Sequence, residues 1–332
     1  GGKTSETWFA QGRYDEKNQF GRGWSLGLQG RWSGSDNLLG KVSFSNPRVW
    51  DSYWYLGGSF TYDSKMMRYA TDYESQEKEI KFEGTIGRKI FEQIKGFLSY
   101  SISSIKPHEE NIILPTTDTI LASSLSVKLS RNALDNYLEP TEGLSTSISH
   151  KITGGFLGGN QRYMETKAEL SFYFPLDFTE TYRTYFRFHI AGGHLWKYLD
   201  TPLPYSSRYR LGGHYDLRGY QFGEISPKEK RASSPTDPTR SYFKGGDRKL
   251  YTQLEYFFPI IKDVNIKGLV FFDSGMVYEE EEPIDLTKFK SDIGFGFRWK
   301  TPVAPFRFEW AYPLDFQKGE MGDMTFIFSL GY

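Results

Sequence analysis

Residues 291–300 read SDIGFGFRWK, and the alternation in this stretch decides the class of fold. Every second residue is large and apolar, namely Ile293, Phe295, Phe297 and Trp299. The residues between them include Gly294, Gly296 and the charged Arg298. Successive side chains of a β-strand point to opposite faces, so one face of this segment is aromatic and the other is polar or small.

The same period continues on both sides of this stretch. It recurs in residues 306–313 and 325–332 toward the C-terminus, and in residues 24–32, 164–174 and 182–190 upstream. Aromatic residues make up 17% of the chain, from 27 Phe, 23 Tyr and 8 Trp. Alternating segments of about ten residues with aromatic side chains near their ends are typical of strands in an outer-membrane β-barrel.

A soluble β-sandwich is the alternative, because its strands also alternate. Such a protein would need a second sheet to cover every aromatic face, whereas lipid covers these faces without one. A helical membrane span is excluded, since no window approaches about 18 consecutive apolar residues. We therefore predict an all-β chain that forms a transmembrane antiparallel β-barrel. Gly294 and Gly296 would face its lumen, and we expect a lysine at Gly296 to cost far less stability than one at the outward Phe295.

Composition removes several function classes. The 332 residues include 41 basic and 41 acidic side chains and no cysteine. This balance argues against a nucleic-acid partner, and the lack of cysteine excludes disulfides, zinc–thiolate sites and thiol nucleophiles. The five histidines lack metal-ligand spacing, and Gly2-Lys3-Thr4 resembles a phosphate loop without the preceding strand and following helix. We expect no enzymatic activity, no cofactor and no metal.

The strand pattern predicts fifteen strands. They cover residues 6–17, 22–33, 38–50, 53–64, 78–90, 94–105, 119–131, 143–153, 162–175, 181–197, 247–258, 264–278, 290–300, 305–313 and 323–332. Tight connections at residues 18–21, 51–52, 177–180 and 302–305 alternate with long polar ones at residues 65–76, 106–118, 200–246 and 279–288. Short periplasmic turns and long external loops are the outer-membrane pattern.

The odd number of predicted strands indicates that one strand of the barrel is missing from this sequence. Bacterial single-chain barrels have even numbers of strands, and placing the long loops outside starts the first predicted strand on the external side. We therefore expect a barrel of the 16-strand type whose first strand lies before Gly1. Residues 1–332 would form one barrel domain, without the periplasmic domains of a longer chain.

The longest connection carries the most specific motif. Residues 208–220 read RYRLGGHYDLRGY, with Gly212 and Gly213 ahead of Leu217-Arg218-Gly219-Tyr220. Residues 131–143, 271–275 and 301–305 carry further motifs, and residues 326–332 end the chain on an aromatic strand. With these features the chain resembles the BamA family of outer-membrane assembly factors, within the BamA/Sam/TamA-type superfamily of insertases and transporters. It departs from the family at Ala304, where glycine is usual.

The resemblance implies that the external loop, about residues 200–246, folds into the lumen with the Arg218-Gly219-Tyr220 tip inside. Strand parity independently turns Glu255, Phe271 and Asp273 inward. An arginine fork suits carboxylate partners, so we expect Arg218 to anchor the loop on Glu255, Asp273 or both. On alternation alone, these two acids could equally be solvated groups of the lumen.

Two functions remain open. The first is an insertase that folds and inserts β-barrel proteins through a lateral seam between its first and last strands. The last strand would supply Phe326, Ile327, Phe328, Leu330 and Tyr332 to that seam. The second is a polypeptide translocation or secretion pore of the same superfamily, and a carbohydrate-binding soluble sandwich is a distant third.

The resemblance also implies a place and partners. It places the chain in the bacterial outer membrane. The partners that it implies are outer-membrane lipid, unfolded β-barrel clients and the accessory lipoproteins of an assembly complex.

Overall fold

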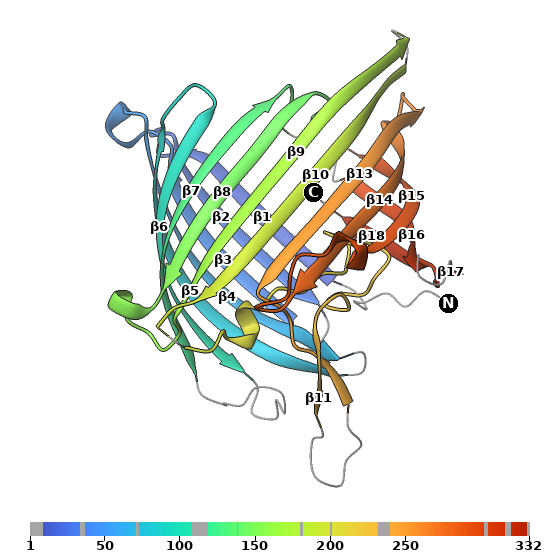
Figure 1. Ribbon diagram of the computed structural model, residues 1–332. Coiled ribbons are helices and arrows are strands. Elements are labelled where there is room, and N and C mark those ends of the chain that lie inside the picture. Colours follow the sequence, from blue (N-terminus) through green and yellow to red (C-terminus); the bar gives the residue numbers. More distant parts are fainter. Residues whose placement is uncertain are drawn as a thin grey trace.

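The computed structural model describes residues 9–33, 37–70, 73–107, 119–137, 139–179, 182–199, 201–231, 240–301, 305–315 and 320–330. Its main element is one sheet in which each strand pairs with the next antiparallel, and Figure 1 shows the tilted strands curving around a lumen. No helix in these ranges is long and apolar enough to span a bilayer.

The strands follow one another around the sheet in chain order, apart from one hairpin. They are β1 (Phe9–Gln19), β2 (Trp24–Ser33), β3 (Asn37–Asn46), β4 (Trp54–Ala70), β5 (Tyr73–Lys89), β6 (Ile94–Pro107), β7 (Ile120–Leu134), β8 (Gly143–Thr153), β9 (Tyr163–Thr179), β10 (Tyr182–Lys197), β13 (Arg248–Ile261), β14 (Ile266–Tyr278), β15 (Lys290–Lys300), β16 (Pro305–Asp315), β17 (Glu320–Met321) and β18 (Thr325–Leu330). β11 (Lys228–Arg231) and β12 (Arg240–Phe243) form a separate hairpin.

The last position of the sheet is shared by two short strands. β17 pairs with the Leu314 end of β16, and β18 pairs with residues 306–311 of the same strand. The path of the sheet therefore has fifteen positions, which matches the number of strands predicted. Within the described residues, four short 3-10 helices lie in the connections: η1 (Val49–Asp51), η2 (Gly155–Leu157), η3 (Tyr205–Ser207) and η4 (Leu286–Lys288).

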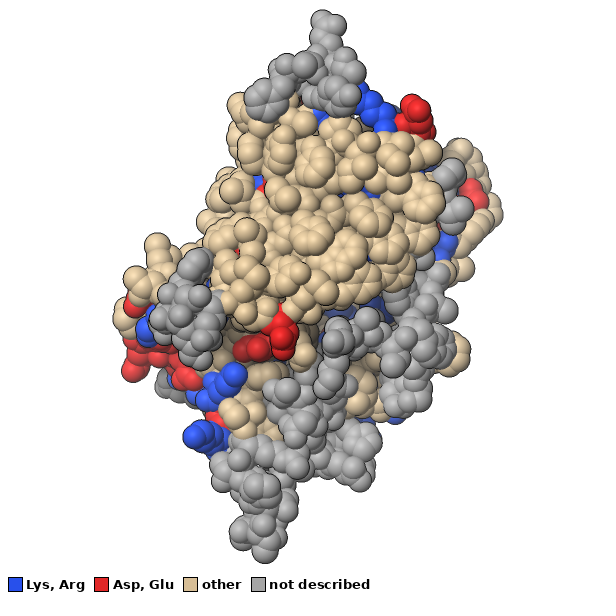
Figure 2. Space-filling view, turned by 90° about the vertical axis from the view of Figure 1, so that its right-hand side faces the viewer, with Lys and Arg blue, Asp and Glu red and all other residues tan. Residues whose placement is uncertain are grey.

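The predicted alternation separates two surfaces. The outward face of the C-terminal strands exposes a set of large apolar side chains: Val270, Ile293, Phe295, Trp299 and Phe328. Figure 2 shows this side of the molecule as a broad band without charged residues, with charges gathered toward its ends. Cross-strand ring pairs reinforce the band, including Phe295 with Trp310 and Phe297 with Phe308 at centroid distances of 5.5 and 4.7 Å. The prediction of a transmembrane antiparallel barrel is confirmed.

Two of the predicted connections contain more strand than expected. Residues 65–76 were predicted as a loop, but β4 and β5 continue to Ala70 and Tyr73, with an irregularity in the register between Arg68 and Ala70. This extension places Lys65 opposite Glu77, and oppositely charged cross-strand pairs favour strand pairing. The connection at residues 200–246 contains the β11–β12 hairpin, whose four-residue strands are too short for a period-two pattern to identify.

The expectation of free space at Gly296 is wrong. A Cβ atom there would lie 2.3 Å from the carbonyl oxygen of Phe308, and one at Gly294 would lie 2.2 Å from the Phe271 ring. Both residues face the lumen as the alternation predicts. However, neighbouring strands and an inward aromatic ring occupy the volume that a side chain would need, and this closeness is not visible in a local pattern.

Adjacent residues of β4 test the assignment of the two faces. Phe60 points outward and packs against Phe82 in a tilted arrangement with ring centroids 4.8 Å apart, whereas Ser59 faces the lumen opposite Glu83. We expect Phe60→Lys to destabilise the barrel by about 2–4 kcal/mol, the cost of a lysine on the lipid face near the midplane. Ser59→Lys should cost far less, because its ammonium stays hydrated beside Glu83. Urea unfolding in lipid vesicles measures both, and equal costs would contradict the assignment.

Candidate functional site

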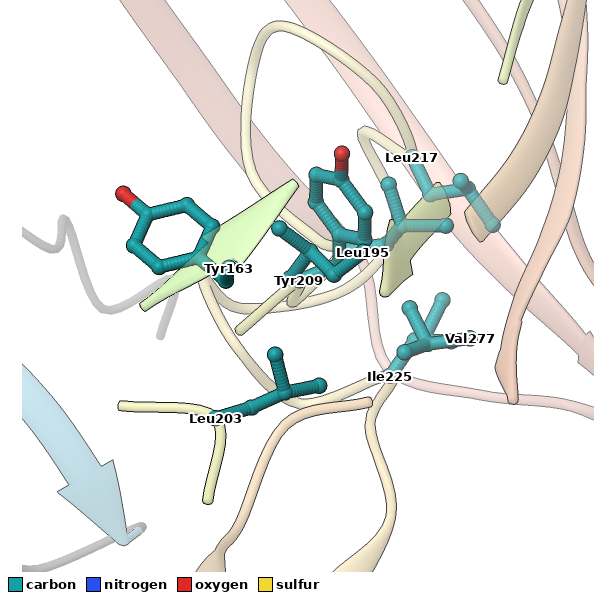
Figure 3. Close-up of a cluster of buried hydrophobic side chains, with 8 residues drawn as sticks. Tyr163, Leu195, Leu203, Tyr209, Leu217, Ile225 and Val277 are labelled. Carbon is teal, nitrogen blue, oxygen red and sulfur yellow. The ribbon is translucent and has the colours of Figure 1, made fainter. Parts of the chain in front are cut away.

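The connection between β10 and β13 fills part of the lumen. Its apolar side chains pack against the inner wall in a buried cluster (Figure 3) that consists of Tyr163, Leu195, Leu203, Tyr209, Leu211, Leu217, Ile225 and Val277. Leu211 and Leu217 are fully buried. Backbone bridges from Tyr209 to Gly246 and from Leu211 to Ile225 hold the segment as a compact loop. Burial of these side chains therefore fixes the loop inside the barrel.

Two glycines and one carboxylate shape the turn before the tip. Gly212 and Gly213 have φ of 113° and 106°, and a Cβ at Gly212 would lie 2.1 Å from the carbonyl oxygen of Gln221. Asp216 Oδ1 accepts hydrogen bonds from the backbone N–H groups of Gly212 and Leu217, each at 2.7 Å. Burial raises the pKa of Asp216 to about 6. Arg218 follows this turn, and its side chain reaches carboxylates of β13, β14 and β16.

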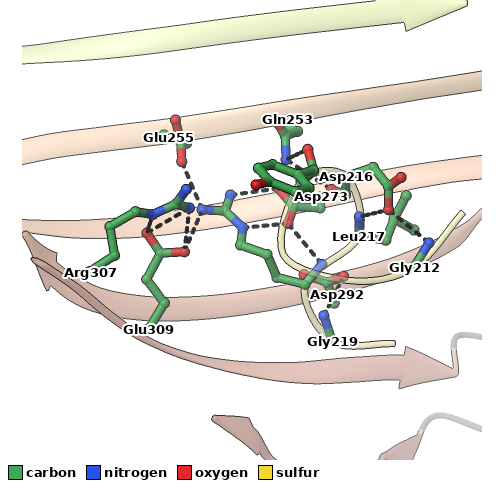
Figure 4. A network of polar contacts seen from close by, with 12 residues as sticks. Gly212, Asp216, Leu217, Gly219, Gln253, Glu255, Asp273, Asp292, Arg307 and Glu309 are labelled. Carbon is green, nitrogen blue, oxygen red and sulfur yellow. Dashed lines mark hydrogen bonds and ion pairs between the residues drawn. The ribbon is translucent and has the colours of Figure 1, made fainter. Parts of the chain in front are cut away.

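The side chain of Arg218 is 1% exposed and lies among three carboxylates, those of Glu255, Asp273 and Glu309, which Figure 4 labels. Nε and Nη2 donate to the two oxygens of Asp273, each at 2.7 Å, which is the bidentate geometry of a strong pair. Nη1 donates to Glu255 at 2.7 Å and to Glu309 at 3.2 Å. The Phe271 ring packs against the face of the guanidinium, and the ring centroid lies 3.5 Å from Arg218 Cζ. The structure thus brings Arg218 together with Glu255, Phe271 and Asp273.

Three more arginines surround the same carboxylates. Arg187 pairs with Glu255 at 2.7 Å, and Arg298 donates to both Glu255 and Glu309. Arg307 pairs with Glu309 at 3.0 Å. Glu255 and Glu309 are 1% and 0% exposed, so each buried charge has more than one partner. Burial of ions is tolerable only with such pairing.

The remaining tip residues contact the last strands. The N–H of Gly219 donates to Asp292 Oδ2 at 2.9 Å, and a Cβ at Gly219 would lie 2.6 Å from Cβ of Asp292. The Tyr220 hydroxyl donates to the carbonyl oxygen of Ser291 at 3.1 Å. The hydroxyl of Thr325, the first residue of β18, donates to the carbonyl oxygen of Gly219 at 3.2 Å. The tip therefore touches β15 and β18 as well as the arginine-binding strands.

A second carboxylate, Glu165, also holds the loop. The Tyr209 hydroxyl donates to Glu165 of β9 at 2.9 Å, and Lys151 and Lys167 each pair with Glu165 at 2.7 Å. Sequence reasoning did not single out this group. It did not single out Glu309 either. Inward parity was the only signal for either residue, because the contacts depend on the path of the loop.

The structure describes four of the five residues predicted for the seam, all except Tyr332. Phe326 and Phe328 point outward and pack on Trp310 and Phe308, with ring centroids 5.3 and 5.1 Å apart, and Ile327 is buried. Leu330 pairs with Phe306 through the backbone. Tyr332 and residues 302–304, which include Ala304, lie outside the described residues.

Comparison with known proteins gives one family. The model of the Omp85 superfamily domain matches residues 18–332. The outer membrane protein assembly factor BamA of Nitratidesulfovibrio vulgaris is 28% identical over 322 residues, which is 95% of this chain and 39% of that protein. BamA of Neisseria meningitidis serogroup B is 26% identical over 228 residues, 60% of this chain and 27% of that protein. The chain therefore spans about two fifths or less of these relatives.

Solved structures agree on the fold. The crystal structure of BamA from Haemophilus ducreyi lacking POTRA domains 1–3 superimposes with a TM-score of 0.74 at 22% identity, covering 97% of this chain and 67% of that one. CdiB from Acinetobacter baumannii gives a TM-score of 0.68 at 18% identity, with coverage of 99% and 57%. These similarities establish the same barrel architecture.

Removal of the Arg218 side chain should have a large effect. Arg218→Ala leaves buried carboxylates without their main partner, and breaking a buried ion pair typically costs about 3–5 kcal/mol. We expect a lower unfolding midpoint in urea and faster proteolysis within residues 201–231. Arg131→Ala is the control, because the exposed Arg131 hydrogen-bonds only to Gln93 among the described residues. Similar losses in both variants would contradict the anchoring role of Arg218.

Asp216 gives the loop a pH dependence. Its pKa in the folded protein, about 6, lies above the ordinary value of 3.8, so the folded state binds the proton more tightly and gains stability as pH falls from 6 toward 4. Asp216→Asn keeps an oxygen acceptor for Gly212 and Leu217 but removes the buried charge. We expect the variant to unfold at a higher temperature than the parent at pH 8, with the difference shrinking at pH 5. A variant that is less stable at pH 8 would refute this account.

Proposed function

The chain belongs to the Omp85 superfamily of outer-membrane β-barrels, and we propose that it is the membrane domain of an insertase that folds other β-barrel proteins into the outer membrane. Its substrates would be unfolded β-barrel polypeptides, and its other partners would be lipid and the accessory lipoproteins of an assembly complex. Insertion of this kind uses strand pairing in place of bond-making chemistry, so the domain would act without a catalytic residue or cofactor.

The edge at β18 carries the proposal. Within the described part of the chain, its residues 325–330 pair with β16 and with no other strand. β1 likewise pairs only with β2 across the ranges that the structure covers. An unpaired strand edge presents a row of N–H and C=O groups that can template another strand.

A lipid environment makes such an unpaired edge energetically unfavourable. The bilayer core offers no water to satisfy free backbone groups, so each unpaired N–H and C=O is costly there. A client strand that adds to β18 would relieve this cost through main-chain hydrogen bonds, as in other cases of strand addition. Successive client strands would then pair with the one already bound.

The loop supports this edge from inside. Arg218 binds carboxylates of β13, β14 and β16, and Gly219 contacts β15 and β18. These contacts join the five final positions of the sheet to one rigid tip. The wall beside the edge can thus keep its curvature while the edge itself opens to a client.

A disulfide lock tests the seam. The chain has no cysteine, so an introduced pair is free of competing thiols in this domain. We would place one cysteine at Ile327 and its mate at successive positions of the first barrel strand of the full-length protein. Oxidation should stop the assembly of a β-barrel client in proteoliposomes, and reduction should restore it, because the client needs the edge.

A second lock provides the control. Leu129 and Ile148 are register partners on β7 and β8, in the middle of the sheet and far from both of its edges, and both are exposed to lipid. Cysteines at these two positions should leave client assembly unchanged when oxidised. If the seam lock also leaves assembly unchanged, the insertase proposal fails and a polypeptide translocation pore becomes the better explanation.

A further inference from the structure

Three neighbouring hairpins present their short turns at one end of the barrel. The strands β1 to β6 are consecutive and antiparallel, so the β1–β2, β3–β4 and β5–β6 turns lie next to one another, and Figure 1 shows the last two at its upper end. With the strand ends beside them, these turns cover residues 18–24, 46–54 and 88–94, which form the short-turn rim. Short turns face the periplasm in outer-membrane barrels. We propose that the short-turn rim binds the headgroups of anionic phospholipids.

The short-turn rim exposes large aromatic side chains. Phe20 and Trp50 are 80% and 94% exposed, and Tyr53 and Phe91 are exposed as well. Phe20 and Trp50 also have φ of 55° and 52°, in the left-handed region that bulky residues rarely adopt. Aromatic rings gain little in water, whereas rings at the level of lipid headgroups are favoured in membrane proteins. The rings therefore indicate that this end of the hairpins lies at a membrane surface.

Each of the three turns also carries an exposed arginine whose guanidinium is available. Within the described residues, the side chains of Arg22, Arg48 and Arg88 make no hydrogen bond and no ion pair. Arg22 and Arg88 lie over the rings of Trp24 and Trp54, each with Cζ 5.2 Å from the ring centroid. Stacking on a ring leaves the donors at the edge of the guanidinium plane open, and this planar fork matches two oxygens of a phosphate.

The charge of the short-turn rim differs from that of the next short turn. The rim contains four basic residues and two acidic ones: Arg22, Arg48, Arg88 and Lys89, and Asp51 and Glu92. The β7–β8 turn, residues 135–142, has three acidic residues and no basic one, although it exposes the ring of Tyr137. A negatively charged lipid surface attracts basic segments. The two places therefore share an exposed ring but differ in the sign of their charge.

An anionic phospholipid fits both features of the short-turn rim. Its phosphate can accept hydrogen bonds from the arginine forks while the rings lie beside the glycerol group and the first carbons of the acyl chains. A soluble phosphate would gain only the ionic contact, and a zwitterionic lipid carries a cationic group that the arginines repel. The proposal requires only that the barrel lies in a membrane, and it does not depend on insertase activity.

Native mass spectrometry of the full chain in neutral maltoside micelles tests the binding. The probes are phosphatidylglycerol and phosphatidylcholine with identical acyl chains, and glycerol 3-phosphate is the soluble headgroup. We expect phosphatidylglycerol to bind at least about fivefold more tightly than phosphatidylcholine, because one basic residue near an anionic surface typically contributes about this factor. Glycerol 3-phosphate at the same concentration should not displace the bound lipid, because it lacks the acyl chains.

One combined variant tests the role of charge. Arg22→Gln, Arg48→Gln and Arg88→Gln together should reduce the preference for phosphatidylglycerol to within about twofold. The control combines Lys197→Gln, Lys288→Gln and Lys290→Gln, which remove the same charge at the opposite end of the barrel. This control should keep the preference of the parent chain.

A second pair of variants tests the role of the rings. Trp50→Ser should weaken the binding of both lipids and leave their ratio unchanged, because the ring contacts parts that the two lipids share. Tyr137→Ser, in the acidic β7–β8 turn, is the matched control and should leave the binding of phosphatidylglycerol unchanged.

Each contrary result overturns the proposal. Equal binding of the two lipids by the parent chain would show that charge is not recognised. A preference that survives the loss of the three arginines, or that falls equally in the lysine control, would place the recognition elsewhere or in the net charge. Displacement by glycerol 3-phosphate would identify a soluble anion as the occupant, and equal effects of Trp50→Ser and Tyr137→Ser would exclude the rings. Because the assay uses no client and no seam, its failure is distinct from failure of the insertase proposal.

Discussion

The buried guanidinium of Arg218 is the constraint on which the site depends. A charge that is 1% exposed must be compensated, and Asp273, Glu255 and Glu309 do this from three different strands. These strands can reach one guanidinium only if the wall curves around it. The tip approaches closely because Gly219 has no side chain, and Gly294 leaves room for Phe271 beneath the cation.

The barrel has two different surroundings, and its composition follows from them. The outward face is aromatic and aliphatic because it contacts lipid, while the lumen holds charged groups in ion pairs. This explains how a membrane-spanning chain can have only 38% hydrophobic residues. It also explains why ionic networks gather around the loop, since the lumen needs internal partners wherever the loop excludes water.

The loop is attached to the wall at two places. Tyr209 binds Glu165 on β9, and Arg218 binds the strands that lead to the end of the sheet. Between these attachments an apolar cluster fills the space, and below the tip a cationic cavity remains. The loop is therefore both a brace for the wall and the roof of this cavity. The edge of β18, which pairs only with β16 within the described residues, lies next to the strands that the loop tip contacts.

The sequence by itself determined the period-two strands, their approximate bounds and their inward or outward faces. The span of residues 143–153 matches β8, and residues 290–300 match β15. Glu255 and Asp273 could be turned inward by parity alone, because alternation is a local property of the extended chain.

Only the tertiary structure decided which inward groups meet. The contacts of Glu309 with Arg218, of Glu165 with Tyr209 and of Glu139 with Lys300 join residues far apart in the chain. The close packing at Gly296 and the extended β4–β5 hairpin were likewise invisible to the pattern. Strand period carries no information on wall curvature or loop path, and these two quantities set every distance across the lumen.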